Sequence, residues 1–332
     1  MPHPLTDLTV GLIGAGGISA VHADAWRALG ARVLVHSVIG AQELADAYGF
    51  TAVATLDEVL AEADIVDIVT PSGTHREIAL RAIDAGLHVI CEKPLAASAE
   101  DAREVADAAE RAGVRLFPAH VVRYFAEYHA LREQVRAGRI GRVATQRFTR
   151  MGQAPATRWF FDEAKGGGVV RDLMIHDLDQ AVWLAGEVTE VYAVQHPASV
   201  DGQVPVPVTA HVTLTHANGV LSHLQATWLS PGMPFRTSIE VSGDQGRLSF
   251  ASRDDATLVA DVAVTDDAGY MPPMSAQESP YYSEITAFVA AIRSGEEARV
   301  SPADGIAAVA LAEAAMASIR SGQPVTLTEV SA

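Results

Sequence analysis

Apolar residues in the first part of the chain come in short runs that alternate with longer stretches of helical periodicity. The short runs predict buried strands near residues 8–13, 32–35, 52, 65–69, 88–91 and 115–117. The stretches between them predict helices that end near Leu29, Ala47, Ala85 and Ala112. In the last of these helices, Ser98 and Asp101 resemble a capping box. This alternation predicts right-handed crossovers and a parallel, doubly wound α/β sheet of the Rossmann type, which we place at residues 1–121.

Beyond residue 121 the pattern changes to a series of strands behind two helices. Helices are expected at 127–137 and 170–184, and strands at 141–151, 191–195, 208–216, 220–228, 238–242 and 247–250. Asn218-Gly219 and Asp244-Gln245-Gly246 are typical of hairpin turns. The segment 271–280 reads as a loop, with helices at 281–292 and 303–319 after it. Residues 122–299 therefore predict a second, α+β domain with a large, mostly antiparallel open sheet.

A glycine turn joins the first strand to the first helix. Gly14, Gly16 and Gly17, followed by Ile18, stand where a dinucleotide-binding turn closes tightly and lets the backbone approach a pyrophosphate at a helix N-terminus. Ser19 replaces the third glycine of that pattern. The alternative is an ordinary glycine-rich turn, but the strand before it and the helix after it favour the dinucleotide interpretation.

The end of the second strand bears on the choice of cofactor. An acidic residue there usually binds the adenosine ribose hydroxyls, but this chain has Ser37. No carboxylate repels a 2′-phosphate, and no arginine follows closely to attract one. NAD and NADP both stay open, and the missing arginine favours NAD.

The strand at 88–91 ends abruptly in charge, as Glu92-Lys93-Pro94. Pro94 disfavours the helical region for Lys93 and so directs its ammonium past the strand end. Ligands of open parallel sheets bind at the carboxyl ends of the strands, so Lys93 is a candidate catalytic group. The alternative is a surface lysine before a turn.

Three polar residues of the helix expected at 170–184 share one face. Asp172, His176 and Asp179 are spaced four and three apart, which places them one above another on a helix. The preceding Gly166-Gly167-Gly168 suggests close backbone approach to something bound, which favours a functional role for Asp172 and His176. For Asp179 and Asp177 a solvated polar face is the alternative. No metal is expected, because too few further His or Cys residues are suitably spaced.

Lys93 and His176 together suit the oxidation of an alcohol. A histidine accepts the hydroxyl proton as the hydride leaves carbon, and a lysine near the oxygen stabilises developing negative charge. Asp172 would hydrogen-bond the substrate or orient the pair. His75 and His120 are further candidates to border the cleft, although a histidine near a helix start, such as His75, is more often a capping or packing residue.

Composition narrows the partners and the compartment. The net charge of −17 argues against nucleic acid and favours a small-molecule substrate. No apolar run reaches the length of a membrane helix, and the first strand begins by Leu8, so neither a membrane span nor a signal peptide is expected. Cys91, the one cysteine, is consistent with a reducing compartment and reads as a small buried hydrophobe. We expect a cytoplasmic protein.

These residues resemble the Gfo/Idh/MocA family of glucose-fructose oxidoreductase and inositol dehydrogenase-like enzymes. The resemblance covers nearly the whole chain and rests on the glycine turn, Thr70-Pro71 with His75, residues 86–89 running into Glu92-Lys93-Pro94, and the triple glycine followed by Asp172 and His176-Asp177. It implies an NAD(P)-dependent oxidoreductase acting on a secondary alcohol or ketone of a sugar, inositol or related polyol.

The resemblance also implies roles for individual residues and an assembly. Lys93, Asp172 and His176 take the family's catalytic positions, and Glu92 and Pro94 help shape the nicotinamide end of the pocket. Ser37, Thr70, Pro71 and His75 join the glycine turn, Glu92 and Lys93 in binding the cofactor. The segment from about 300 to 332 would dock on the nucleotide domain, and the chain would form a homodimer or homotetramer through its open sheet.

Two other functions and the substrate itself stay open at the level of sequence. One alternative is a redox-neutral glycosidase that keeps NAD bound, and the other is a non-catalytic NAD(P)- or sugar-binding regulator. Substrate contacts are expected from Lys93, Asp172 and His176 and from Arg123 and Trp159. Arg147, Arg150 and Arg158 are further candidates, although a structural or surface role is an alternative for each of these arginines and for Trp159.

Overall fold

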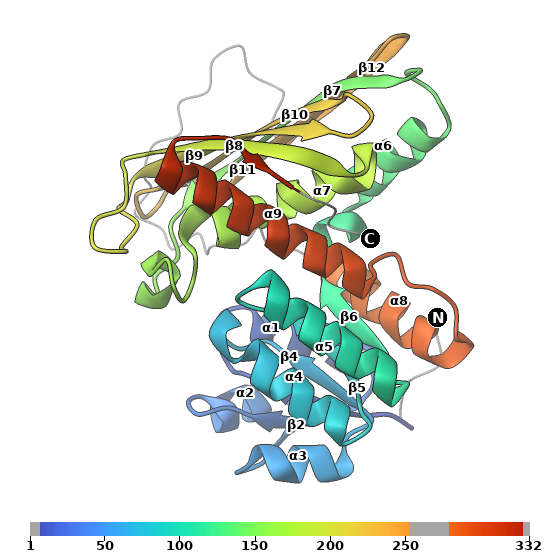
Figure 1. The fold of residues 1–332 in the computed structure, drawn as a ribbon. Coiled ribbons are helices and arrows are strands. Elements are labelled where there is room, and N and C mark those ends of the chain that lie inside the picture. The colour runs from blue at the N-terminus through green and yellow to red at the C-terminus, as the bar shows by residue number, and fades with distance from the viewer. Residues whose placement is uncertain (1–6, 253–278, 328–332) are drawn as a thin grey trace. The chain divides into compact units, whose positions relative to one another are not determined.

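The structure is a computed structural model that describes residues 7–252 and 279–327 (Figure 1). Its contacts divide the described chain into two compact units. The first holds residues 7–125 and 279–306, and the second holds 126–252 and 307–327. Most of the loop expected at 271–280 lies outside the described residues.

The first unit is built on a 6-stranded parallel sheet with the order β3-β2-β1-β4-β5-β6. The strands are β1 (Thr9–Ile13), β2 (Arg32–His36), β3 (Thr51–Ala52), β4 (Ile65–Ile68), β5 (His88–Glu92) and β6 (Leu116–Ala119). The helices between them are α1 (Ser19–Leu29), α2 (Ala41–Tyr48), α3 (Leu56–Glu62), α4 (His75–Asp84) and α5 (Ala99–Ala112). The predicted doubly wound Rossmann sheet is confirmed.

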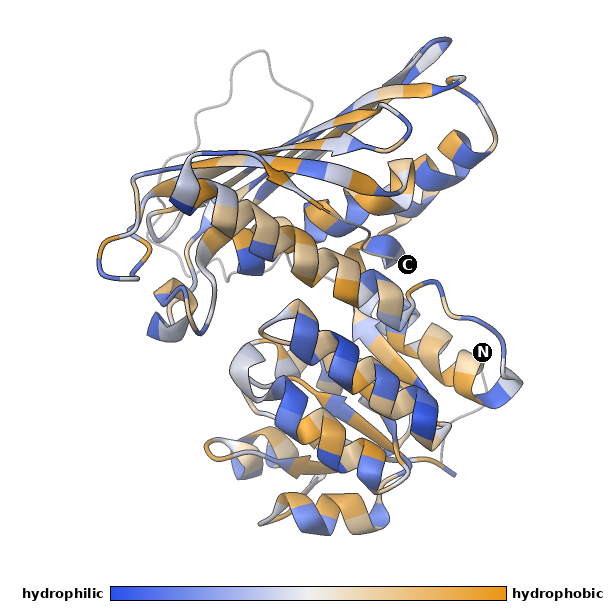
Figure 2. Cartoon of the chain, viewed as in Figure 1, coloured by the Kyte–Doolittle hydropathy of each residue, from blue (hydrophilic) through white to orange (hydrophobic). Residues whose placement is uncertain are grey.

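Capping boxes begin helices α5 and α3 of this unit. Ser98 Oγ accepts the Asp101 amide at 3.0 Å, as the sequence predicts, and Ala102, Val105 and Ala109 of α5 are buried. The opposite face of α5 is hydrophilic (Figure 2). Helix α3 was not among the predicted elements, yet Thr55 Oγ1 accepts the Glu58 amide at 3.2 Å in the same kind of box. The Thr-x-x-Glu spacing is a sequence signal that could have revealed α3.

The second unit contains a 7-stranded sheet with the order β12-β11-β7-β10-β9-β8-β13. The strands are β7 (Val143–Gln153), β8 (Val188–His196), β9 (Val208–His216), β10 (Leu221–Leu229), β11 (Arg236–Gly243), β12 (Gly246–Ala251) and β13 (Val325–Thr326). The two predicted hairpins are present as the antiparallel pairs β9–β10 and β11–β12. Only the pair β7–β10 is parallel, so the described sheet is mostly antiparallel, as predicted.

Helices α6 (Ala126–Arg136) and α7 (Ile175–Ala185) accompany this sheet. Buried polar side chains tie α7 to its strands: Gln146 of β7 donates to the Ala181 carbonyl at 3.0 Å and to Ser222 Oγ of β10 at 2.8 Å. Because buried polar groups need partners, these bonds fix how α7 lies on the sheet.

The last two helices differ from the predicted domain division. Helix α8 (Pro280–Ser294) belongs to the first unit, where Phe288 stacks on Phe117 of β6 at 4.7 Å between ring centroids. The sequence predicted a helix at 281–292, but a local pattern cannot say against which core a helix packs.

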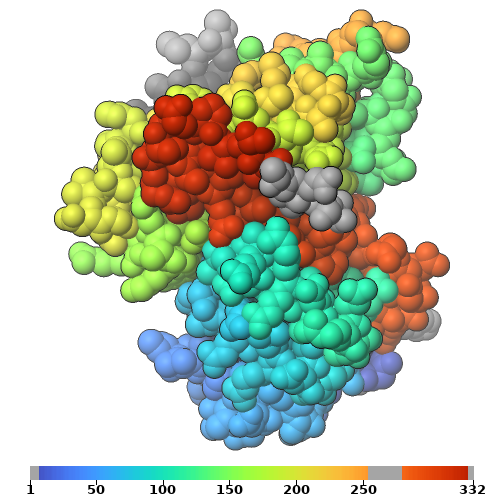
Figure 3. Space-filling view, in the orientation of Figure 1, coloured from blue at the N-terminus to red at the C-terminus, as the bar shows by residue number. Residues whose placement is uncertain are grey.

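The segment after residue 306 belongs to the second unit, whereas the family resemblance implied that residues from about 300 dock on the nucleotide domain. Helix α9 (Pro302–Ser321) ends beside β8, where Ser318 Oγ accepts the Ala193 amide at 2.9 Å. Strand β13 then pairs with β8, with Val325 opposite Val191. Figure 3 shows the C-terminal residues in red against the yellow-green strands of this sheet. The two-residue strand β13 is too short to give a sequence signal.

Helix α9 is the one helix in the described ranges that is long and apolar enough to cross a membrane, with a mean hydropathy of 1.3 over its best window. Inside the structure 56% of that window is buried. A buried core helix passes the same test, so length and composition are a weak argument for a membrane span here.

Candidate active site

The glycine turn between β1 and α1 leaves open space beside its backbone. Gly14 has φ +117°, and a Cβ there would lie 2.7 Å from the Val69 carbonyl oxygen, so this position requires glycine. Gly16 and Gly17 are exposed, and a Cβ at either would meet nothing within 4 Å. Ser19 Oγ donates to the Gly16 carbonyl at 2.5 Å. The serine in place of the third glycine therefore helps to close the turn.

The turn stands where a dinucleotide would bind. Strand β1 lies between β2 and β4, so the direction of strand succession reverses there and opens a crevice at the carboxyl ends. Ile18, which precedes α1, has no polar side chain to cap the helix amides. The open backbone and the positive end of the helix dipole fit a pyrophosphate.

The end of β2 offers hydroxyl and apolar groups where many dinucleotide folds have a carboxylate. Ser37 Oγ donates to the Ile39 carbonyl at 2.8 Å. The side chains of Val38 and Ile39 are 96% and 82% exposed. Residues 36–40 include no Asp, Glu, Lys or Arg that could meet an adenosine at this edge of the sheet.

His75 joins the loops that follow β4 and β5. Its Nδ1 lies 2.8 Å from the Pro94 carbonyl and its Nε2 lies 2.8 Å from the Thr70 carbonyl, and the side chain is buried. Both ring nitrogens are thus engaged by the protein. His75 has the packing role that the sequence left open beside the functional one, and no ring nitrogen remains for a cofactor.

Thr70 and Pro71 lie in the loop after β4. Thr74 Oγ1 donates to Thr70 Oγ1 at 2.7 Å and to the Pro71 carbonyl at 2.8 Å, which closes the loop on itself. Thr70 is half-buried and Pro71 is exposed at the carboxyl end of the sheet. Their position agrees with the expected role in cofactor binding.

Lys93 follows the last residue of β5 and is half-buried. Glu92 beside it is buried, and its Oε1 lies 3.2 Å from His22 Nε2 of α1. Burial by itself would raise the pKa of Glu92, but the hydrogen bond from His22, with the charges of His22 and Lys93, holds it below its ordinary value. Glu92 is therefore a buried carboxylate directly beside the candidate catalytic lysine.

The triple glycine is explained by packing within the chain. A Cβ on Gly166 would lie 2.5 Å from Phe160 Cα, and one on Gly168 would lie 2.6 Å from Val204 Cγ2. Gly167 and Gly168 also have φ of +74° and +64°. The close approach that these glycines permit is to their own chain, so the prediction that they mark contact with a ligand is not supported by their surroundings.

Asp172 lies in a π-helical turn, Val170–Met174, which leads directly into α7. Such turns within α-helices are frequent at functional sites. Asp172 is buried and His176, in the first turn of α7, is half-buried. The wider turn changes the expected α-helical geometry, but both residues belong to the same helical segment.

Asp177 and Asp179 do not form a solvated face. Asp177 is buried and accepts both a 2.7 Å bond from Arg150 Nη2 and a 3.1 Å bond from Arg150 Nε. Asp179 is also buried, and its Oδ2 accepts from Gln180 Nε2 at 3.3 Å. Spacing alone predicted a solvated polar face as the alternative for these residues, but both side chains are buried.

Some of the arginines predicted as substrate contacts are buried and others are exposed. Arg123 is 2% exposed and donates to Asp304 Oδ1 at 2.8 Å and to the Arg299 carbonyl at 3.1 Å. Burial would raise the pKa of Asp304, but the Arg123 charge and hydrogen bonds lower it. These bonds give Arg123 a structural role, and the substrate contact predicted from the sequence stays a prediction. Arg150 is the buried partner of Asp177, whereas Arg147 is exposed.

Trp159 lies in a short 3₁₀ helix, Arg158–Phe161, after β7. Its ring stacks on Phe160 at 3.9 Å, and both rings are half-buried while Arg158 is exposed. Trp159 therefore keeps an exposed part that a substrate could contact.

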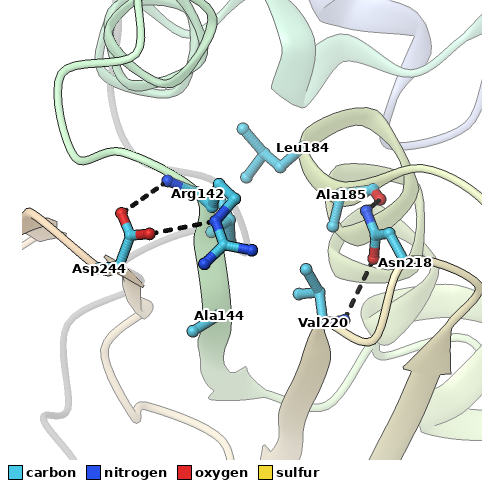
Figure 4. Close-up of a pocket in the computed structure, with 8 residues that line it drawn as sticks. Arg142, Ala144, Leu184, Ala185, Asn218, Val220 and Asp244 are labelled. Atoms are coloured by element: carbon cyan, nitrogen blue, oxygen red, sulfur yellow. Dashed lines mark hydrogen bonds and ion pairs between the residues drawn. The ribbon is translucent and has the colours of Figure 1, made fainter.

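A surface cavity of about 460 Å³ lies in the second unit (Figure 4). It is lined by Arg142, Val143, Ala144, Leu184, Ala185, Asn218, Val220 and Asp244. Its polar groups bind one another: Asp244 accepts from the Arg142 amide and Nε, and Asn218 bridges the Ala185 carbonyl and the Val220 amide. Ala185 also lies roughly 13 Å along α7 from His176. This cavity is not the candidate active site.

Together, the Rossmann unit with its open glycine turn and the α+β unit with an open sheet define a two-domain dinucleotide-binding oxidoreductase. Two family models match the chain: "Oxidoreductase family, NAD-binding Rossmann fold" over residues 8–120 and "GFO/IDH/MocA C-terminal domain" over residues 128–249. The chain belongs to the Gfo/Idh/MocA oxidoreductase family, as the resemblance of its motifs predicts.

Similar proteins cover nearly the full length. Inositol 2-dehydrogenase of Rhizobium meliloti strain 1021 is 32% identical over 96% of this chain and 98% of its own. D-apiose dehydrogenase of Paraburkholderia graminis is 30% identical over 97% of this chain and 90% of its own. The crystal structure of GenD2 from gentamicin A biosynthesis, in complex with NAD, superposes with a TM-score of 0.86 at 27% identity and covers 97% of each chain.

His22 and Asp67 are polar residues of the first unit that the sequence reasoning missed. Both are buried, and His22 Nδ1 lies 2.9 Å from Asp67 Oδ2. An aspartate inside the apolar run Ile65-Val66-Asp67-Ile68 is a signal that could have found the pair, because a buried carboxylate needs a partner.

Proposed function

We propose that this oxidoreductase transfers a hydride between a nicotinamide cofactor and a secondary alcohol or ketone of a sugar, inositol or related polyol. The observation that carries the proposal is the retention of Lys93 at the carboxyl end of β5 together with Asp172 and His176 in one helical segment. Relatives named for inositol and D-apiose support the substrate class.

Each of the three residues has a chemical task in the proposed reaction. In the direction of oxidation, His176 takes the proton of the substrate hydroxyl, and its half-buried position keeps the imidazole accessible. The ammonium of Lys93 stabilises the negative charge that develops on the same oxygen. Asp172 orients the substrate or His176. When bound, the nicotinamide accepts the hydride.

The cofactor proposed is NAD in preference to NADP. Gly14, Gly16, Gly17 and Ile18 would hold the pyrophosphate, and Ser37 would meet the adenosine ribose. Residues 36–40 include no arginine or lysine to bind a 2′-phosphate. The NAD complex of GenD2 and the NAD-binding family model agree with this choice.

We also propose a cytoplasmic homodimer or homotetramer that binds neither nucleic acid nor membrane. Tyr192 and Val194 of β8 and Leu221 of β10 are each more than 40% exposed and would help bury the open sheet against a second copy. Analytical ultracentrifugation tests this, because a purely monomeric protein at micromolar concentration would contradict it.

The test of the catalytic roles is a pair of substitutions, Lys93→Ala and His176→Ala. With a polyol that the wild type oxidises, each should lower turnover by about 10²-fold or more. The matched control is Lys165→Ala, because Lys165 is 71% exposed and pairs only loosely with Asp162 at 3.4 Å. Turnover of either test variant within about threefold of the wild type would contradict the assignment.

The same assays separate the proposed dehydrogenase from its alternatives. A redox-neutral glycosidase would consume a glycoside without net formation of NADH. A regulator would bind cofactor or sugar and turn over neither.

A further inference from the structure

A buried cluster of charged side chains lies behind Lys93 in the first unit. His22 of α1 stands between two carboxylates, with Nδ1 2.9 Å from Asp67 Oδ2 and Nε2 3.2 Å from Glu92 Oε1. Trp26, one turn along the same helix, donates to the same Asp67 oxygen at 2.7 Å. Asp67 and His22 are fully buried and Glu92 is 5% exposed.

The geometry favours a protonated His22. A neutral imidazole donates through one nitrogen only, and its other nitrogen would direct a lone pair at a carboxylate oxygen. Both nitrogens face carboxylates here, so both contacts are attractive when the ring is an imidazolium. Burial by itself would lower the pKa of His22, but Asp67 and Glu92 raise it well above its ordinary value.

The groups that face His22 come from each element packed against it. Asp67 lies on β4, Glu92 on β5 and Trp26 on its own helix, and the ring of Tyr281 from α8 lies 5.7 Å away between centroids. One imidazolium between two carboxylates leaves the cluster with a net charge of about −1. Lys93, which carries the ammonium, follows Glu92 directly in the sequence.

The cluster reaches Lys93 through Glu92. The second carboxylate oxygen of Glu92 accepts the Lys93 amide at 3.0 Å, while its first faces His22. On the far side, His75 Nδ1 lies 2.8 Å from the Pro94 carbonyl. The backbone around Lys93 is therefore fixed at two points, the Lys93 amide and the Pro94 carbonyl. The bond to the Lys93 amide depends on the orientation of the Glu92 carboxylate.

We propose that His22 is a positioning residue: as a buried cation between Asp67 and Glu92, it fixes the Glu92 carboxylate that in turn orients Lys93. This inference rests on the proposed function, because it explains how the lysine is held for the reaction. His22 touches no reacting atom, so its effect is exerted only through Glu92.

The chain offers an unusually clear reporter for this proposal, because it contains two lysines, Lys93 and Lys165. Reductive methylation with ¹³C-formaldehyde labels both side chains and the N-terminal amine, and each gives its own NMR signal. Lys165 lies exposed in the second unit and serves as an internal reference.

The experiment compares the Lys93 signal of the folded full chain in His22→Gln, Glu92→Gln and Trp26→Phe. His22→Gln and Glu92→Gln should each shift or split the Lys93 signal and leave the Lys165 signal unchanged. The double variant His22→Gln/Glu92→Gln should shift the Lys93 signal no further than the single variant with the larger effect. Trp26→Phe is the matched control, because it disturbs the same buried Asp67 without touching Glu92. A purely structural His22 would lower stability but leave the Lys93 signal at its wild-type position, which would overturn the proposal.

A second measurement needs no variant and covers the case in which His22→Gln fails to fold. In ¹⁵N-histidine spectra of the wild type, the ring in contact with Tyr281 should carry protons on both nitrogens at pH 7.5 and above. One protonated nitrogen at that pH would overturn the proposal. Neither spectrum depends on turnover, so a failure to find any oxidised polyol would count against the proposed function and not against the role of His22.

Discussion

At the scale of single residues, the site depends on how buried polar groups find partners. Glu92, His22 and Asp67 form one hydrogen-bonded chain, and His75 binds two carbonyls at the ends of neighbouring strands. These bonds lie behind the loops at the carboxyl edge of the sheet. They explain why Lys93 has a defined position although it follows the end of a strand.

Stability should depend on pH through His22. Its pKa is raised in the folded protein, so the native state binds more protons than the unfolded chain above about pH 6.5. The contribution of His22 is complete below that pH and is lost as pH rises through the folded-state pKa. Urea unfolding between pH 6 and pH 9 should show stability falling more steeply for wild type than for His22→Gln. Equal slopes would contradict this assignment.

Cofactor preference should respond to Ser37→Asp. A carboxylate there would accept hydrogen bonds from the ribose hydroxyls of NAD and repel the 2′-phosphate of NADP. We expect binding of NADPH to weaken by about tenfold or more, since a shift of ~1.4 kcal/mol corresponds to that factor, while NADH binding holds or improves. Fluorescence titration with both cofactors measures this. Ser37→Ala is the control, because it removes the hydroxyl bond to Ile39 without adding charge.

At the scale of elements, the segment from the triple glycine to α7 differs from the regular α-helix that the sequence predicted at 170–184. Left-handed glycines, a π-helical turn and then an α-helix follow one another within 166–185. The result is a helix start that buries Asp172 and leaves His176 half-buried.

Substitutions at glycines should separate backbone strain from steric contact. Gly168→Ala meets both, because φ is +64° and the new Cβ would lie 2.6 Å from Val204. Gly138→Ala is matched in strain, with φ +71°, but meets nothing within 4 Å. We expect Gly138→Ala to lower the free energy of unfolding by about 1–2 kcal/mol and Gly168→Ala to lower it clearly more. Chemical denaturation of both variants measures this. Equal losses of unfolding free energy in the two variants would show that the Val204 side chain can move aside without a measurable cost.

The buried pair of Arg150 and Asp177 should hold α7 on its sheet. Asp177→Asn leaves a buried guanidinium without its carboxylate, so the free energy of unfolding should fall by about 3–5 kcal/mol. Glu240→Gln breaks the exposed pair with Arg247 and should change it by at most about 1 kcal/mol. Urea denaturation of both variants tests the contrast, and similar losses would argue against the importance of burial.

At the scale of the whole molecule, most helices and strands were predictable, with α3 and β13 as exceptions, whereas their packing partners were not. The strands of the Rossmann sheet and the hairpin at Asn218-Gly219 follow from local patterns, and the structure has them. The assignment of α8 to the first unit and of β13 to the second depends on tertiary contacts such as Phe117 with Phe288. No local pattern carries that information.

For the candidate site, the sequence predicted which residues are candidates but not which groups surround them. Motifs identified Lys93, Asp172 and His176 as candidates, because charged and polar residues at strand ends and on a helical face stand out in sequence. Arg123 and His75 were predicted to contact ligands, and in the structure both also bond to groups of the protein itself. Whether a polar side chain serves the fold or a ligand depends on its neighbours in space.

We propose that this chain oxidises a polyol hydroxyl with a nicotinamide cofactor and that Lys93 takes part. The most direct measurement incubates the wild type, Lys93→Ala and Lys165→Ala with NAD and a panel that includes inositols, D-apiose and other sugars, and follows the absorbance of NADH. We expect NADH formation by the wild type and Lys165→Ala with at least one of these compounds, and a loss of about 10²-fold in Lys93→Ala. Equal rates of NADH formation in all three proteins would contradict it.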